Sequence, residues 1–100
     1  MIPIEKVKDI IVKHNNLEKE LSSGKIDPKL FAKKSKQYST LGHIISYARE
    51  FIKFESEKKD LEQIIKDQNS DIEMVEMAEK DLDDLKIKKI EYENKLKIFL

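Results

Sequence analysis

The sequence contains no cysteine and no tryptophan, and it has only two glycines, two prolines and one arginine. The absence of cysteine excludes disulfide bonds and thiol chemistry within these residues, and it agrees with a reducing compartment, so we expect a cytoplasmic protein. The longest run of apolar residues is three. We therefore expect neither a transmembrane span nor the apolar core of a signal peptide, and no membrane partner.

Charged residues are abundant instead. They make up 40% of the 100 residues, the formal net charge is zero, and this composition is typical of long helices. The charges are nevertheless unevenly placed. Residues 25–49 carry a net charge of +5, whereas residues 71–84 carry a net charge of −6. We therefore expect a molecule that is electrically polar from end to end or from face to face.

Helix signals predict three helices, at about residues 3–23, 28–67 and 71–100. Gly24 is expected to end the first helix in the left-handed conformation, and Asp27 with Pro28 to begin the second as its N-cap and first turn. Ser70 and Glu73 have the spacing of a capping box for the third helix. Gly42 is the one residue inside the long second helix that disfavours the helical conformation. It is therefore a place where a bend or a close backbone approach can occur.

The third helix has the clearest periodicity. Its apolar stripe has alternating spacings of three and four and consists of Val75, Ala78, Leu82, Leu85, Lys89, Tyr92, Leu96 and Phe99, of which only Lys89 is polar. A second apolar line, formed by Ile87, Ile90 and Ile98, predicts that the C-terminal half of this helix has two helical neighbours.

These patterns predict an all-α fold, an elongated antiparallel three-helix bundle with a protruding two-helix coiled-coil hairpin. The hairpin is expected over about residues 50–82, with the polar run 53–60 mostly solvated. Residues 1–100 form a single helical domain in this interpretation. Because the sequence stops on three apolar residues without a helix cap, we expect it to be an excised N-terminal fragment of a longer protein.

Candidate catalytic and metal-binding residues are few. Asp67, Asn69 and Asp71 match the start of a calcium loop, but the glycine and glutamate that such a loop requires are replaced by Ile72 and Ala78. A capped interhelix loop explains these residues better. We therefore expect no metal, no cofactor and no enzymatic activity of these residues on their own.

Three further features have a structural explanation that competes with a functional one. His14 lies on the apolar stripe of the first helix, where a half-buried histidine with satisfied hydrogen bonds is favoured over a metal ligand. Asp81 and Asp84 share a helix face, which favours a solvated acidic surface over a catalytic pair. Met74 and Met77 could form a soft groove for a partner, but packing at the hairpin tip is the favoured interpretation.

A basic helix face is the strongest candidate for binding. Lys29, Lys33 and Lys36 follow one another at spacings of four and three, so they present their ammonium groups on one side of the predicted helix. Such a face suits phosphates or an acidic partner. Solvated lysines that only maintain solubility are the alternative, because arginine and stacking aromatic residues are scarce there.

Two segments resemble a known family. Residues 71–82 read DIEMVEMAEKDL, and residues 36–45 read KQYSTLGHII. Both are similar to segments in the N-terminal domain of bacterial class I peptide chain release factors, type 1. The spacing between the two segments also fits that family. The resemblance covers most of residues 30–100. Ile72 replaces a usual proline and Gln37 a usual acidic residue.

The resemblance implies a translation termination factor that directs stop-codon-dependent release of the nascent peptide on the ribosome. It implies that this domain positions the factor and contacts the stalk base region of the ribosome, without reading nucleic acid sequence itself. A recycling GTPase release factor is a further partner that the resemblance suggests. The Gly-Gly-Gln motif by which the family hydrolyses peptidyl-tRNA is not in these residues. We expect a monomer. The alternative left open by the sequence is a stand-alone coiled-coil adaptor or structural interaction protein.

Overall fold

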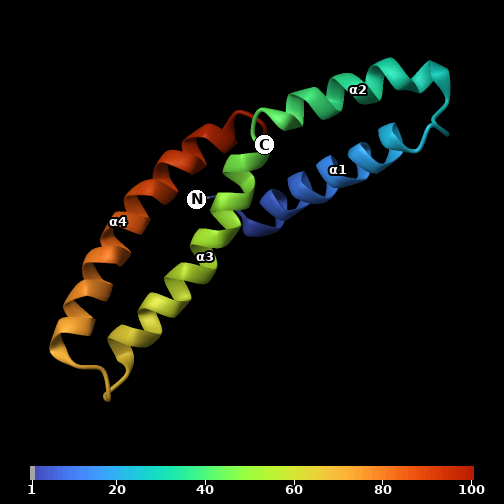
Figure 1. The fold of residues 1–100 in the computed structure, drawn as a ribbon. Coiled ribbons are helices and arrows are strands. Elements are labelled where there is room, and N and C mark those ends of the chain that lie inside the picture. Colours follow the sequence, from blue (N-terminus) through green and yellow to red (C-terminus); the bar gives the residue numbers. More distant parts are fainter. Residues whose placement is uncertain (1) are drawn as a thin grey trace.

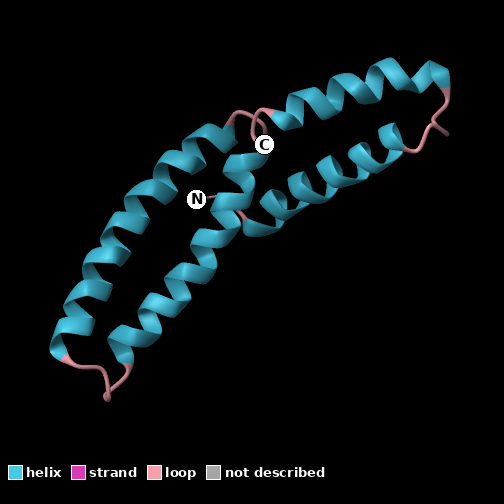
Figure 2. Ribbon diagram, in the orientation of Figure 1, coloured by secondary structure: helices cyan, strands magenta, loops and turns pink. Residues whose placement is uncertain are grey.

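A computed structural model describes residues 2–100 and contains four α-helices (Figure 1). They are α1 (Ile4–Ser22), α2 (Pro28–Gly42), α3 (Ile45–Lys66) and α4 (Ile72–Lys97). Within residues 2–100 the helices are joined only by loops and turns, and there is no strand (Figure 2). The molecule measures 61 × 24 × 17 Å. The predicted all-α class and elongated shape are thus confirmed.

The prediction of one helix over residues 28–67 is wrong, because the chain bends after Gly42 and begins α3 at Ile45. At the bend, the backbone N–H of His43 donates to the carbonyl of Thr40 at 3.3 Å, and that of Ile44 donates to Leu41 at 3.1 Å. These are tighter turns than the α-helical pattern. Ile44 is 2% exposed, so the bend turns an apolar side chain into the core.

The bend divides the molecule into two antiparallel hairpins that extend in opposite directions from a shared centre, near which the chain's C-terminus lies (Figure 1). Helix α1 packs against α2 and against α3, whereas α4 packs along α3. The fold therefore has four helices instead of the expected three. The protruding two-helix hairpin is present and is formed by α3 and α4.

The core lies where the two hairpins meet. Its buried residues come from the start of the chain, α1, the bend, α3 and α4. They are Ile2, Val7, Ile10, Ile44, Ala48, Phe51 and Leu96. Helix α4 contributes Leu96, which is completely buried. Burial of this apolar surface is the main favourable contribution that holds the two hairpins together.

Helix α4 buries the stripe expected from its periodicity but lacks the expected second neighbour. Ala78, Leu85 and Leu96 are buried on the side that faces α3. Ile87 and Ile90 are 60% and 59% exposed, and Ile98 is 82% exposed. The second apolar line is therefore mostly exposed, because α1 packs on α2 and α3 and does not extend along α4.

The helix ends largely follow the local signals. Gly24 has a φ of 70°, as expected for a left-handed residue after α1. The carboxylate of Asp27 accepts a hydrogen bond from the backbone N–H of Lys29 at 2.9 Å, which caps α2. The N-cap of α4 is Asp71, one residue later than the expected Ser70, and its carboxylate accepts from the N–H of Met74 at 2.8 Å.

No helix in the part of the chain that the structure describes is long and apolar enough to cross a membrane.

Replacing Gly42 by alanine is expected to raise the free energy of unfolding by about 0.5–1 kcal/mol. A Cβ added at Gly42 would meet no atom within 4 Å, and Gly42 does not have positive φ. Alanine would therefore favour the last turn of α2 without a clash. Chemical denaturation followed by circular dichroism measures the change. A loss of stability would show that the bend requires glycine.

Candidate functional site

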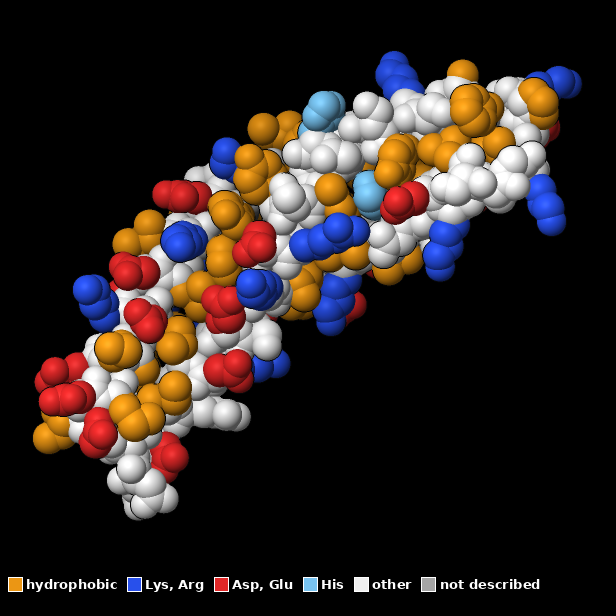
Figure 3. Space-filling view, viewed as in Figure 1, with side chains coloured by type: hydrophobic (Ala, Val, Ile, Leu, Met, Phe, Trp, Pro, Cys, Tyr) orange, Lys and Arg blue, Asp and Glu red, His pale blue; other side chains and the backbone are white. Residues whose placement is uncertain are grey.

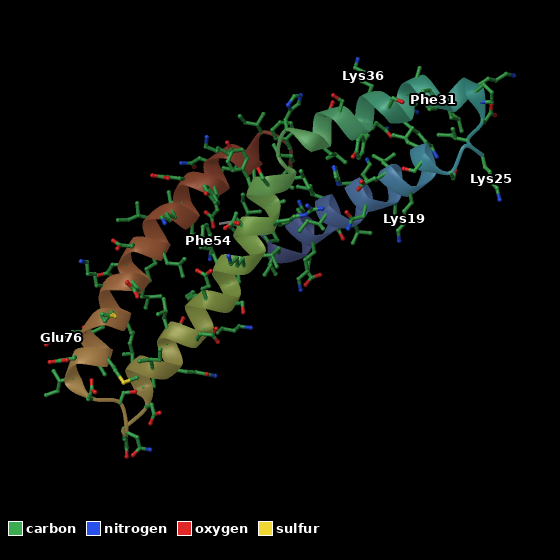
Figure 4. The ribbon with its side chains drawn as sticks, viewed as in Figure 1. Lys19, Lys25, Phe31, Lys36, Phe54 and Glu76 are labelled. Carbon is green, nitrogen blue, oxygen red and sulfur yellow. The ribbon has the colours of Figure 1, made fainter. Side chains whose placement is uncertain are left out.

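The expected basic face lies on α2, in the hairpin formed by α1 and α2. Lys29, Lys33 and Lys36 are all exposed. The cap at Asp27 and the proline at position 28 fix where α2 begins, and the helical period then sets the spacing of the three lysines on its surface. Figure 4 labels Lys36, whose side chain extends away from α2 toward solvent.

The structure adds a lysine from another helix to this face. A shallow groove of about 390 Å³ lies between α1 and α2 and is lined by Lys13, Lys33, Lys36, Gln37, Thr40 and Leu41. Lys13 belongs to α1 and is exposed. No acidic side chain lines this groove. The groove brings Lys33 and Lys36 together and leaves Lys29 outside its lining, one turn nearer the start of α2.

Two other cationic residues of the segment 25–49 form contacts within the fold. Lys34 forms an ion pair with Glu20 of α1, and its side chain is 29% exposed. A guanidinium nitrogen of Arg49 donates to the side-chain oxygen of Asn15 at 3.4 Å. Both contacts join sequence-distant helices, so these two charges contribute to packing as well as to the surface potential.

The arrangement can bind an anion. Lysine ammonium groups are mobile point charges that hold phosphates or carboxylates without reading nucleotide bases. The hydroxyl of Thr40, at the groove, donates instead to the backbone carbonyl of Lys36 at 3.0 Å. The geometry therefore fits electrostatic contact with a large anionic surface.

Two of the remaining candidates, Asp67 and Asp71, have structural partners. Asp67 accepts a hydrogen bond from the backbone N–H of Asn69 at 2.9 Å, so it stabilises the loop between α3 and α4, and Asp71 caps α4. Residues 2–100 contain no group of three or more histidine, cysteine or acidic side chains that could hold a metal ion. Asp81 and Asp84 are exposed on α4.

His14 is more buried than expected. It is 7% exposed, and its ring stacks on Tyr38 of α2 with centroids 4.8 Å apart. Its Nδ1 atom has no hydrogen-bond partner among residues 2–100, where a histidine with satisfied hydrogen bonds was expected. The ring packs α1 against α2 as a flat, largely apolar body.

Sequence reasoning missed Lys13 as part of the basic face. Lys13 lies on α1 and Lys33 on α2, on opposite sides of the hairpin turn, and no local pattern indicates which side of α1 will lie beside α2. A helical-wheel comparison of α1 and α2 would have placed Lys13 on the basic face only after the packing faces were known.

The fold defines the class of the molecule as an all-α domain of paired helical hairpins. Comparison with known sequences is more specific: the profile of the PCRF domain matches residues 10–100. The chain therefore belongs to the PCRF domain family.

Curated relatives agree with this family. The chain is 56% identical over all of its 100 residues to "Peptide chain release factor 1" of Pelagibacter ubique (strain HTCC1062), of which it covers 28%. It is 39% identical over 75 residues to the protein of the same name from Orientia tsutsugamushi (strain Boryong), covering 75% of the chain and 21% of the relative. It is 36% identical over 74 residues to that of Streptococcus gordonii, covering 74% of the chain and 21% of the relative.

The chain thus spans less than a third of the length of the curated relatives it matches. No solved structure matches it.

Proposed function

We propose that this chain is the N-terminal helical domain of a translation termination factor that directs stop-codon-dependent release of the nascent peptide on the ribosome. The observation that carries the proposal is the 56% identity over the whole chain to a protein named peptide chain release factor 1. Membership in the PCRF domain family supports it. Within the factor, this domain serves positioning and contact and does not catalyse the release step.

The separation of contact from catalysis follows from the sequence. The two glycines stand alone at positions 24 and 42, so these 100 residues contain no Gly-Gly-Gln motif for hydrolysis. The groove is lined by three lysines and no acidic side chain, which suits binding of an anion. Catalysis belongs to other parts of the factor.

The partner of the basic face is the ribosome, in the stalk base region, where ribosomal RNA offers a dense array of phosphates. Lys13, Lys33 and Lys36 neutralise phosphates without reading the bases. A recycling GTPase release factor is a further partner of the domain. The domain acts as a monomer in the cytoplasm.

Reversing the charge of Lys29, Lys33 and Lys36 together to glutamate is expected to weaken ribosome binding by about tenfold or more at low salt. The three side chains are exposed, so the fold should be retained. Binding of the purified 100-residue chain to bacterial ribosomes, measured by cosedimentation between about 50 and 200 mM salt, tests this. Wild-type binding should weaken as salt rises, and the variant should depend less on salt.

A matched control carries the same change in charge on the other hairpin. Lys59, Lys66 and Lys86 are also exposed, and they lie on α3 and α4. Their triple glutamate variant should lose much less affinity than the variant of the basic face. Equal losses would indicate that only the net charge matters, and unchanged binding of both variants would remove the basic face from the proposal.

The coiled-coil adaptor that the sequence left open is less well supported, because the family match covers residues 10–100. Sedimentation distinguishes the self-contained domain from the adaptor. A monomer over a wide concentration range supports the self-contained domain, whereas a concentration-dependent dimer would favour the adaptor.

A further inference from the structure

A second groove lies on the opposite hairpin and is unlike the basic one. Two adjoining hollows of about 400 and 150 Å³ run between α3 and α4 and share Leu61 and Asp81 in their linings. Because they share these residues, we treat them as one groove that reaches from Phe54 toward the tip of the hairpin. We call it the acidic groove and define it by Glu57, Asp60, Leu61, Met77, Asp81 and Asp84.

The floor of the acidic groove is apolar near the tip. Leu61, Ile64, Met74 and Met77 line it there, together with Ala78. Met74 is 49% exposed and Met77 is 67% exposed, so packing within the hairpin leaves much of both side chains in water. Methionine side chains are flexible and polarizable, and they adapt well to the surface of a partner. This exposure favours the partner groove over the internal packing expected for these methionines.

The rim of the acidic groove is strongly negative. Four carboxylates, from Glu57, Asp60, Asp81 and Asp84, line its wider part together with a single lysine, Lys88. Glu57 has Lys53 at 4.0 Å, whereas Asp60, Asp81 and Asp84 form no ion pair within residues 2–100. Figure 3 shows hydrophobic side chains along this hairpin with acidic side chains gathered beside them. The groove therefore combines an apolar floor with a rim in which carboxylates outnumber lysines.

We propose that the acidic groove binds an amphipathic helix of a partner protein that carries lysine or arginine residues beside one apolar stripe. The apolar stripe would cover Leu61, Met74 and Met77, and the basic residues would meet the rim carboxylates. Complementary charge fixes the orientation of such a helix and speeds its association. An acidic peptide or a phosphate-rich surface would be repelled from the same place.

This site is separate from the proposed ribosome contact. The basic groove lies between α1 and α2, whereas the acidic groove lies between α3 and α4. The two hairpins extend in opposite directions (Figure 1). The domain could therefore bind an anionic surface with one hairpin and a basic helix with the other, and a failure of either contact would leave the other testable.

The test uses a synthetic helical peptide of about 18 residues, or five turns, with one leucine stripe and lysines on both of its flanks. Binding to the purified 100-residue chain is followed by backbone NMR at low salt. Saturable shifts confined to the groove residues are expected. A peptide with glutamate in place of each lysine should bind at least about tenfold more weakly, because the rim repels it.

Matched variants of the chain locate the binding. Asp81→Lys with Asp84→Lys reverses two rim charges and should weaken binding of the lysine peptide by about tenfold. Glu79→Lys with Asp83→Lys makes the same change on exposed residues of α4 that do not line the groove, and it should cause much less loss.

A similar comparison tests the apolar floor. Met77→Ser should weaken binding of the lysine peptide. Ile87→Ser, at another exposed position of α4, should leave that binding unchanged. The proposal is overturned by equal losses in the paired variants, by shifts outside the groove, or by self-association of the chain through this surface. Absence of saturable binding would overturn it as well.

Discussion

Replacing Phe51 by alanine is expected to lower the free energy of unfolding by about 3–5 kcal/mol. Phe51 is 1% exposed and is among the largest fully buried side chains of the molecule. It lies in the core cluster with Val7 of α1 and Leu96 of α4, so its ring is located where the two hairpins meet. Truncation removes buried apolar surface and leaves a cavity in the core.

The expected loss is a large fraction of the stability of such a small, elongated domain. Urea unfolding followed by helical circular dichroism measures it. Phe31→Ala is the matched control, because Phe31 is 49% exposed on α2 and its truncation should change stability by less than about 1 kcal/mol. Similar effects of both substitutions would contradict a core located at the junction.

The second large effect concerns the charge inside the apolar stripe of α4. The Lys89 side chain is 14% exposed and forms an ion pair with Glu55 of α3, whose side chain is 25% exposed. The Lys89 ammonium also lies 5.5 Å from the centre of the Phe51 ring. Replacing Glu55 by alanine leaves this largely buried ammonium without its carboxylate, so we expect a loss of about 1–3 kcal/mol.

The double variant Glu55→Ala with Lys89→Met should recover most of that loss, because methionine fills the slot without a charge. Glu62→Ala provides the control, since Glu62 pairs with Lys58 at 4.0 Å and both side chains are more than a third exposed. It should change stability by about 0.5 kcal/mol or less. A single Glu55 substitution without effect would show that the pair does not contribute.

Local signals in the sequence specify much of the fold. The spacing of Leu85 and Leu96 indicates which face of α4 is buried, and both are buried. Gly24 and Asp27 act where their chemistry predicts, because a left-handed turn and an N-cap depend on neighbouring residues alone.

Non-local features could not be predicted in this way. Gly42 marks in the sequence where a bend can occur, but no local signal shows that the bend places Ile44 in a core that also needs α1 and α4. Phe54 lies in a run expected to be solvated, yet it is 6% exposed and stacks on Tyr92 with ring centroids 5.1 Å apart. Lys13 joins the basic groove for the same reason, because tertiary packing and not local spacing decides which side chains meet.

The measurement that tests the central claim most directly is release of a nascent peptide from ribosomes stalled at a stop codon. The 100-residue chain alone should release no peptide, and in excess it should slow release by a complete bacterial release factor, since both would occupy the same ribosomal contact. Unchanged release at concentrations where the chain saturates ribosomes would contradict the proposed contact. Peptide release by the chain alone would contradict its role as a positioning domain.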